Sequence, residues 1–148
     1  MRENALMERI LVPVDGSECS LRAVGLAIDL ARSSVDSSIH VLGVAAAPIV
    51  YGEVAVYQGG ARAEQDAAAH GNELVRDAKA ALAASGIRHV VEVLPGEPGA
   101  VVARRADELG ATLIVMGTHG RSRLGNVVIG SVAMSVVHRV SIPVTLVK

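Results

Sequence analysis

The chain has 148 residues, the size of a single domain, and its 14 Lys and Arg nearly balance its 15 Asp and Glu. No nucleic-acid partner is expected, because the sequence has no basic block and, with two Tyr and no Phe or Trp, few rings that could stack on bases. The single cysteine excludes a disulfide framework and a thiolate metal cluster. There is no secretion signal and no apolar stretch of the roughly 20 residues that cross a bilayer, so we expect a cytoplasmic protein without membrane contact.

The expected domain spans residues 9–148 and follows a short extension, residues 1–8. Its first element is a strand over residues 10–14, because a continuous apolar run is typical of a strand buried on both faces. Pro13 is expected to end the pairing of this strand, since proline has no N–H to donate. Apolar residues at helical spacing then predict a helix over residues 18–32.

The next part of the chain contains a strand, a long loop and a helix. Ser17 is the expected N-cap of the first helix. The second strand is predicted over residues 39–44, and the loop over residues 45–60 is long enough to indicate function or mobility. A second helix over residues 61–85 ends at Gly86.

The second half of the chain repeats the alternation of strand and helix. A strand over 89–94, a helix over 100–109, a strand over 112–116, a helix over 131–140 and a strand over 144–147 are predicted. Strands that alternate with helices indicate an α/β fold, here a single-domain, Rossmann-like sheet of five parallel strands with helices on both faces. In such sheets ligands bind at the carboxyl ends of strands where the winding direction reverses. We therefore expect the turns after the first and fourth strands to be neighbours.

A glycine-rich turn follows the fourth predicted strand and leads to the fourth helix. It reads Gly117-Thr118-His119-Gly120, nine further residues, and Gly130-Ser131. Bare backbone N–H groups and the positive end of a helix suit a phosphate group, so the pattern indicates a nucleotide-binding site. Gly117 and Gly120 can take positive φ and let the backbone approach the nucleotide, whereas a side chain at either position would push the phosphates or the ribose outward.

The start of the predicted fourth helix supplies the groups that would bind an anion. The N–H groups of Ser131, Val132 and Ala133 lie in its first turn without an intrahelical partner, and the helix dipole favours negative charge there. The Ser131 hydroxyl can donate as well. Taken singly, a Ser at a helix start is more often an N-cap and a glycine pair more often a turn, so only their combination indicates phosphate binding.

Four segments together resemble the universal stress protein family. They are Val12 to Ser17, Val115 to Ser122, Gly130 to Ala133 and Ile142 to Val144, and their order and spacing extend the resemblance over residues 8–148. The resemblance implies a sheet ordered 3-2-1-4-5 and, for the ATP-binding branch of the family, a G-2x-G-9x-G(S/T) motif. The chain carries this motif as Gly117, Gly120, Gly130 and Ser131.

The resemblance also implies a ligand, ATP with Mg²⁺, and a set of binding residues. Asp15 aligns with the acidic residue near the ribose and the metal, and the backbone of Val44 with the group that hydrogen-bonds the adenine edge. On spacing alone, Asp15 serves equally well as a cap of the first helix, Arg121 either adds charge at the polyphosphate or faces solvent, and His119 is more often a plain loop residue. The complete predicted set is Pro13, Val14, Asp15, Val44, Met116, Gly117, His119, Gly120, Arg121, Ser122, Gly130, Ser131, Val132 and Ala133.

The implied function is nucleotide-dependent regulation in a stress response, with slow ATP hydrolysis at most because the chain lacks a P-loop lysine. A binder of AMP or cyclic AMP is an alternative, because the adenine and ribose contacts are shared, and so is a nucleotide-free dimeric interaction module. An adenylating enzyme of the adenine-nucleotide α-hydrolase type fits less well, since its Ser-Gly-Gly-rich loop is not matched by Asp15 to Glu18. We expect a homodimer through the edge strand Val144 to Val147, which fits the family's habit of forming dimers.

Overall fold

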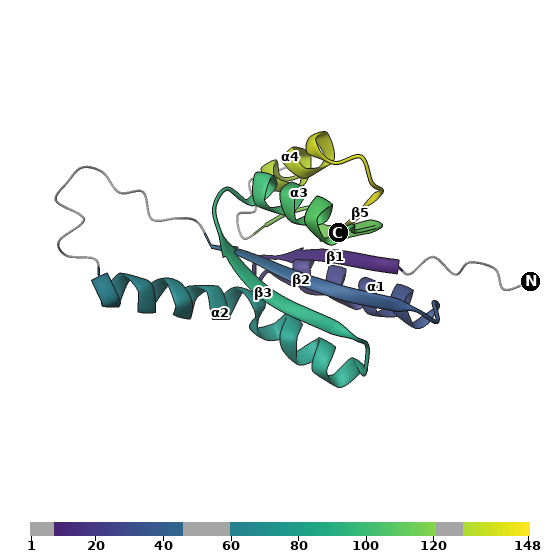
Figure 1. Cartoon of the computed structure of the whole chain (residues 1–148), viewed down its shortest axis with the longest axis horizontal. Coiled ribbons are helices and arrows are strands. Elements are labelled where there is room, and N and C mark those ends of the chain that lie inside the picture. Colours follow the sequence, from purple (N-terminus) through teal and green to yellow (C-terminus); the bar gives the residue numbers. More distant parts are fainter. Residues whose placement is uncertain (1–7, 46–59, 121–128) are drawn as a thin grey trace, which may run out of the picture.

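Strands and helices alternate along the chain in the computed structural model, which describes residues 8–45, 60–120 and 129–148 (Figure 1). The predicted strands and helices are all present, with ends that differ by one or two residues. The predicted loop and the predicted extension lie almost entirely outside the described residues. The elements are β1 (Glu8–Val14), α1 (Glu18–Arg32), β2 (Ser37–Ala45), α2 (Gly60–Ser85), β3 (His89–Pro95), α3 (Pro98–Leu109), β4 (Leu113–Gly117), α4 (Ser131–Arg139) and β5 (Val144–Val147).

The strands form one parallel sheet in the order β3-β2-β1-β4-β5, which confirms the predicted α/β fold and its strand order. Helices α1 and α2 lie on one face of the sheet, and α3 and α4 lie on the other (Figure 1). The winding direction reverses between β1 and β4. The carboxyl ends of these two strands therefore frame the crevice in which sheets of this kind bind ligands.

Alternating side chains of the central strand β1 build a core on each face of the sheet. Ile10, Val12 and Val14 are buried on the side of α1 and α2, whereas Leu11 is buried on the side of α3 and α4. Apart from Met116, the described members of both cores are Val, Ile, Leu and Ala. None of these described members is aromatic or a cysteine. The continuous apolar runs of the sequence thus correspond to strands that helices cover on both faces.

Pro13 limits the pairing of β1 on one side only. Toward β2, the register continues to the last residue of β1, with Val14 opposite Gly43. Toward β4, the register contains only Ile10 and Leu11, so these two strands part before Pro13. The prediction that pairing ends at Pro13 is therefore wrong on the side of β2, where the register continues past Pro13 to Val14. It agrees with the parting of β1 from β4.

Side-chain caps fix the starts of α1 and α3. Ser17 caps α1, as predicted, by accepting a hydrogen bond from a first-turn N–H at 3.2 Å. Helix α3 begins earlier than predicted, at Pro98, because the Glu97 carboxylate accepts hydrogen bonds from the N–H groups of Gly99 at 2.9 Å and Ala100 at 2.7 Å. These bonds, chiefly the one from Ala100, hold the pKa of Glu97 below its usual range.

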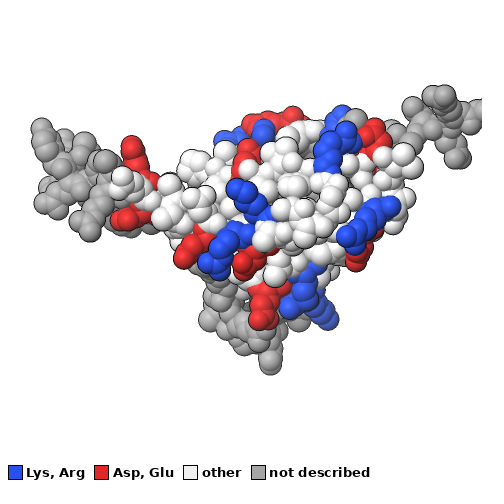
Figure 2. Space-filling view, turned by 90° about the horizontal axis from the view of Figure 1, so that it is seen from below, with Lys and Arg blue, Asp and Glu red and all other residues white. Residues whose placement is uncertain are grey.

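Charges of both signs alternate over the side of the molecule on which α1 and α2 lie (Figure 2). Several of them pair within one helix, such as Arg22 with Glu18 and Arg76 with Asp77, and their side chains are half-exposed or more. Exposed pairs of this kind contribute about 0–1 kcal/mol each. The described residues on this face form no broad basic surface. Within the described ranges, no helix combines the length and the hydropathy of a membrane span.

Helices α3 and α4 approach one another closely at Gly99. A Cβ atom placed on Gly99 would lie 2.6 Å from the Cβ of Ser135 and closer still to its hydroxyl oxygen. Helices α3 and α4 cannot easily move apart at this point, because Gly99 is buried in their contact. The missing side chain of Gly99 therefore sets the distance between the two helices.

We predict opposite effects for two Gly-to-Ala substitutions. Gly99→Ala is expected to lower the free energy of unfolding by about 1–3 kcal/mol, because the new methyl group overpacks the contact with Ser135. Gly25→Ala is the matched control: it lies exposed in α1 with nothing within 4 Å of its Cβ position, and it should raise the free energy of unfolding by up to about 1 kcal/mol. Urea unfolding of both variants checks this, and equal effects would contradict it.

Candidate functional site

A cavity of about 330 Å³ opens at the carboxyl edge of the sheet, where β1 and β4 part. The ends of β1, β2 and β4 and the starts of α3 and α4 line it. The cavity thus lies at the reversal point of the sheet.

The residues predicted for the site line this cavity wherever the structure describes them. They are Pro13, Val14, Asp15, Val44, Met116, Gly117, His119, Gly120, Gly130, Ser131, Val132 and Ala133. Arg121 and Ser122 lie outside the described residues. Segments that are far apart in the sequence therefore meet around one space.

The sequence analysis misses four further residues of the lining: Leu42, Pro98, Val102 and Thr118. Leu42 could have been found, because it stands two residues before Val44 and so lies on the same face of β2. Pro98 and Val102 belong to the start of α3, which follows the carboxyl end of β3 at the same sheet edge. Thr118 lies inside the glycine turn, where its hydroxyl hydrogen-bonds Nδ1 of His119 at 2.8 Å.

Helix α4 begins at the cavity without a side-chain cap. Its N-cap residue Gly130 has an extended backbone, with φ −73° and ψ 164°, whereas α1 and α3 have side-chain caps. The N–H of Gly130 donates a hydrogen bond to the carbonyl oxygen of Thr118 at 2.6 Å, which docks the start of the helix onto the glycine turn. The first-turn N–H groups of α4 belong to residues that line the cavity and have no side-chain partner among the described residues. They can therefore bind an acceptor there.

The glycines of the turn pack closely against other parts of the protein. Neither Gly117 nor Gly120 uses the positive φ that glycine allows. The protein itself packs against both residues: a Cβ on Gly117 would lie 3.1 Å from the backbone carbonyl carbon of Cys19, and a Cβ on Gly120 would lie 2.8 Å from Oδ2 of Asp15. Backbone packing against the start of α1 thus excludes a side chain at Gly117, whereas the contact at Gly120 is with the end of the Asp15 side chain, which can turn away.

Cys19 ties the glycine turn to the last strand. Its thiol donates a hydrogen bond to the carbonyl oxygen of Val147 at 3.0 Å, and the N–H of Thr118 donates to the same oxygen at 2.8 Å. Burial raises the pKa of the thiol, but hydrogen bonds with the backbone of His119 and the side chain of Thr118 outweigh burial and lower it. The start of the turn is therefore held between α1 and β5.

Asp15 brings a carboxylate to the cavity. Its Oδ1 accepts a hydrogen bond from the N–H of Ser17 at 3.0 Å, which closes the turn before α1, while Ser17 supplies the helix cap. Its Oδ2 faces Gly120. Asp15 is the one carboxylate among the described lining residues, and no cluster of three or more potential metal ligands occurs in the described ranges. A metal ion at this position would take most of its ligands from a bound molecule and from water.

The opposite side of the cavity is apolar. Leu42 and Val44 of β2 and Pro98 and Val102 of α3 line it. Val44 and Pro98 are partly exposed, whereas Leu42 and Val102 are fully buried in the core beneath the cavity. One apolar side and one side with backbone N–H groups together suit a ligand that has a flat ring at one end and an anionic group at the other.

The sequence model of the universal stress protein family matches residues 7–148. This chain belongs to that family. The universal stress protein described here is 31% identical over 143 residues to universal stress protein MJ0531 of Methanocaldococcus jannaschii, and the alignment covers 97% of this chain and 83% of the relative.

Two solved structures share the fold of this universal stress protein. The hypothetical protein MJ0577, whose structure was used for a structure-based assignment of its biochemical function, superposes with a TM-score of 0.82 at 22% identity and covers 97% of this chain and 96% of its own. A universal stress protein in complex with cAMP superposes with a TM-score of 0.70 at 25% identity, over 95% of this chain and 97% of its own. The likeness to the first structure shows the fold alone.

Proposed function

We propose that this universal stress protein binds an adenine nucleotide, ATP with Mg²⁺, in the cavity between β1 and β4. The observation that carries the proposal is the start of α4, where uncapped N–H groups beside the bare Gly130 open onto the cavity. Phosphate groups bind such helix starts through the N–H groups and the helix dipole. In this proposal the protein regulates a stress response by presenting its loops differently with and without nucleotide, and it hydrolyses ATP slowly at most.

In the proposed pose, the phosphates lie at α4 and the base lies between β2 and α3. Val44 and Pro98 offer partly exposed apolar surface to the purine ring, and the backbone of Val44 hydrogen-bonds the adenine edge. Asp15 lies between the two ends, beside the ribose. Arg121 and Ser122, together with the other residues of the predicted set, complete the proposed contacts.

AMP and cyclic AMP are the alternative ligands, because the base and ribose contacts do not require a triphosphate. The relative solved in complex with cAMP supports adenine nucleotides as the ligand class. Calorimetric titration with ATP, AMP and cyclic AMP separates these ligands. A preference for ATP with Mg²⁺ of about tenfold or more supports the proposal. Equal affinities would mean that the site recognises only the adenosine part of the ligand. If none of the three ligands bound, the nucleotide-free interaction module would be the function that remains.

Gly130→Asp is expected to abolish ATP binding while the fold is retained. The extended backbone of Gly130 suits an Asp N-cap, whose carboxylate would accept the first-turn N–H groups of α4 and repel phosphate. Calorimetry should show an affinity for ATP lower by about a hundredfold or more, since a charge-assisted bond and a like charge act together. Urea unfolding should show a stability within about 1 kcal/mol of the parent protein.

The matched control for this experiment is Gly130→Ala. It carries the same Cβ, 3.1 Å from the carbonyl oxygen of Thr118, but no carboxylate, so the difference between the two variants isolates the cap and its charge. Gly117 is unsuitable for this test, because a side chain there would press on the backbone of Cys19 and disturb the fold. If the Asp variant bound ATP as tightly as the Ala variant, α4 would not be the phosphate site.

Asp15→Asn tests the proposed metal ion by a change of sign. With Mg²⁺ present, the variant should bind ATP about fivefold more weakly, because the carboxylate attracts the metal. With Mg²⁺ chelated, it should bind ATP more tightly, because the carboxylate repels a free polyphosphate. The Asn side chain keeps an oxygen that can accept from the N–H of Ser17, so the turn is preserved. An effect of the same sign in both titrations would remove the metal from the proposal.

We propose further that two copies pair through β5. This strand lies at an edge of the sheet, with β4 as its neighbour in the described part of the chain. Antiparallel pairing with the same strand of a second copy would satisfy the backbone groups along that edge. Light scattering at micromolar concentration should give twice the chain mass of 15.2 kDa. A monomer mass would contradict this pairing.

A further inference from the structure

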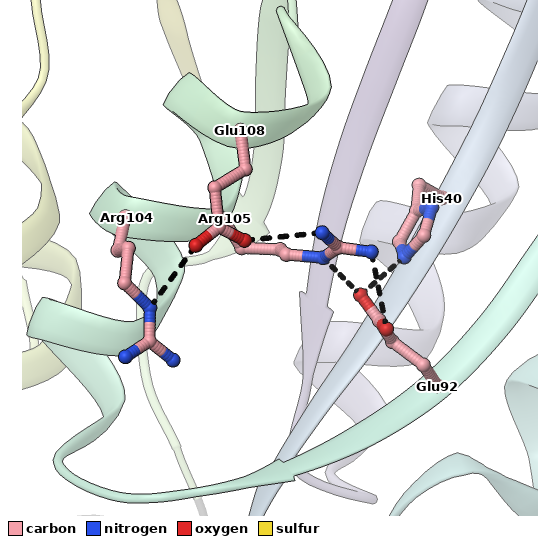
Figure 3. Close-up of polar contacts among 5 residues, drawn as sticks. All are labelled: His40, Glu92, Arg104, Arg105 and Glu108. Atoms are coloured by element: carbon pink, nitrogen blue, oxygen red, sulfur yellow. Dashed lines mark hydrogen bonds and ion pairs between the residues drawn. The ribbon is translucent and has the colours of Figure 1, made fainter.

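A network of charged side chains joins β2 and β3 to α3 on the face of the sheet that carries the cavity (Figure 3). The Arg105 guanidinium bonds Glu92 through two nitrogens, Nε to Oε1 at 2.5 Å and Nη2 to Oε2 at 3.3 Å. His40 Nε2 lies 2.6 Å from the same Oε1. On the outer side, Arg105 Nη1 reaches Glu108 at 3.0 Å, and Arg104 Nε lies 3.6 Å from Glu108.

The inner part of this network is largely shielded from solvent. The side chains of His40, Glu92 and Arg105 are 15%, 24% and 25% exposed, whereas that of Arg104 is 61% exposed. Burial raises the pKa of Glu92, but the hydrogen bonds from Arg105 and His40 outweigh burial and lower it. Glu92 is therefore ionised at neutral pH, and the loss of one partner would leave a shielded charge incompletely paired.

The two elements that this network joins are those that form the apolar side of the cavity. On α3, Arg105 lies one helical turn beyond Val102 and two turns beyond Pro98, and both of these residues line the cavity. On β2, His40 lies on the same face as Leu42, two residues before it, and Glu92 of β3 stands opposite Leu42 in the strand register. The network thus lies directly behind the wall formed by Leu42 and Val102.

We propose that Glu92 and Arg105 are positioning residues for the base-binding half of the nucleotide site. The bidentate bond holds α3 against β2 and β3, and it thereby sets the position of Pro98 relative to Val44, the partly exposed lining residues on this side of the cavity, against which the purine ring would lie. The phosphate half is built on β4 and α4, and the hydrogen bond that fixes the start of α4, from Gly130 to Thr118, involves neither Glu92 nor Arg105. The inference rests on the proposed function, since it assigns the base to this side of the cavity.

The test compares ATP with inorganic tripolyphosphate, both titrated by calorimetry in the presence of Mg²⁺. Arg105→Met and Glu92→Gln are expected to weaken ATP binding about tenfold and to change tripolyphosphate binding less than about twofold, because only the base half is displaced. Arg105→Lys, which keeps the charge without the bidentate geometry, should fall between the parent and Arg105→Met. Equal losses for both probes, or no loss for ATP, would overturn the proposal.

Arg104→Met is the matched control. It removes an arginine from the next position of the same helix, where the side chain is mostly exposed and pairs with Glu108 alone. Both probes should bind this variant within about twofold of the parent, because exposed pairs contribute little. A loss of ATP binding equal to that of Arg105→Met would mean that total charge, and not the bond to Glu92, is responsible.

Amide hydrogen exchange of the nucleotide-free proteins gives a readout that does not require ligand binding. Arg105→Met should raise exchange in α3 and β3 more than in α4, which touches α3 only through packing, and leave β5 unchanged. Unchanged exchange in α3 would overturn the positioning role. If the parent protein bound no ATP, the proposed function would fail, and the exchange data would still report whether the bond holds α3 in place.

Discussion

The hydrogen bond from the N–H of Gly130 to the carbonyl oxygen of Thr118 fixes where α4 begins, and the proposed site depends on that position. A Cβ atom at Gly130 would lie 3.1 Å from the same oxygen, a tight contact that a small shift of the turn relieves. With this bond in place, the positive end of α4 meets the parting ends of β1 and β4. In the proposed site, the groups that bind phosphate at α4 are backbone N–H groups. The sequence therefore marks the site by residues that lack side chains more than by residues that carry charge.

The sequence predicted those features that depend on local pattern. Apolar runs and helical spacing located every described strand and helix, and the reversal rule for parallel sheets brought the turns after β1 and β4 to one edge. The site residues on β1, β4 and α4 followed from the glycine spacing and from the family resemblance. Pro98 and Val102 were missed because the position of α3 over β2 is a tertiary property. The close contact of Gly117 with Cys19 was not predicted, because it joins residues that are distant in the sequence.

The two sides of the cavity are held by different interactions. The side of β4 and α4 is fixed by backbone hydrogen bonds and by the absence of side chains, which leave little freedom. The side of β2 and α3 is fixed by aliphatic packing and by the bidentate bond between Glu92 and Arg105. The contact of Gly99 with Ser135 links the two sides, so a substitution at Glu92 or Arg105 acts first on the side of β2 and α3 and reaches α4 only through packing.

The carbonyl oxygen of Val147 accepts hydrogen bonds from both Cys19 and Thr118. One atom of the edge strand β5 therefore also anchors the start of the glycine turn. If pairing orders β5, the glycine turn loses less conformational entropy when it becomes ordered in turn. By linkage, ordering of the turn has the same effect on β5. The carbonyl group of Val147 thus links the cavity to the edge strand β5 through two hydrogen bonds.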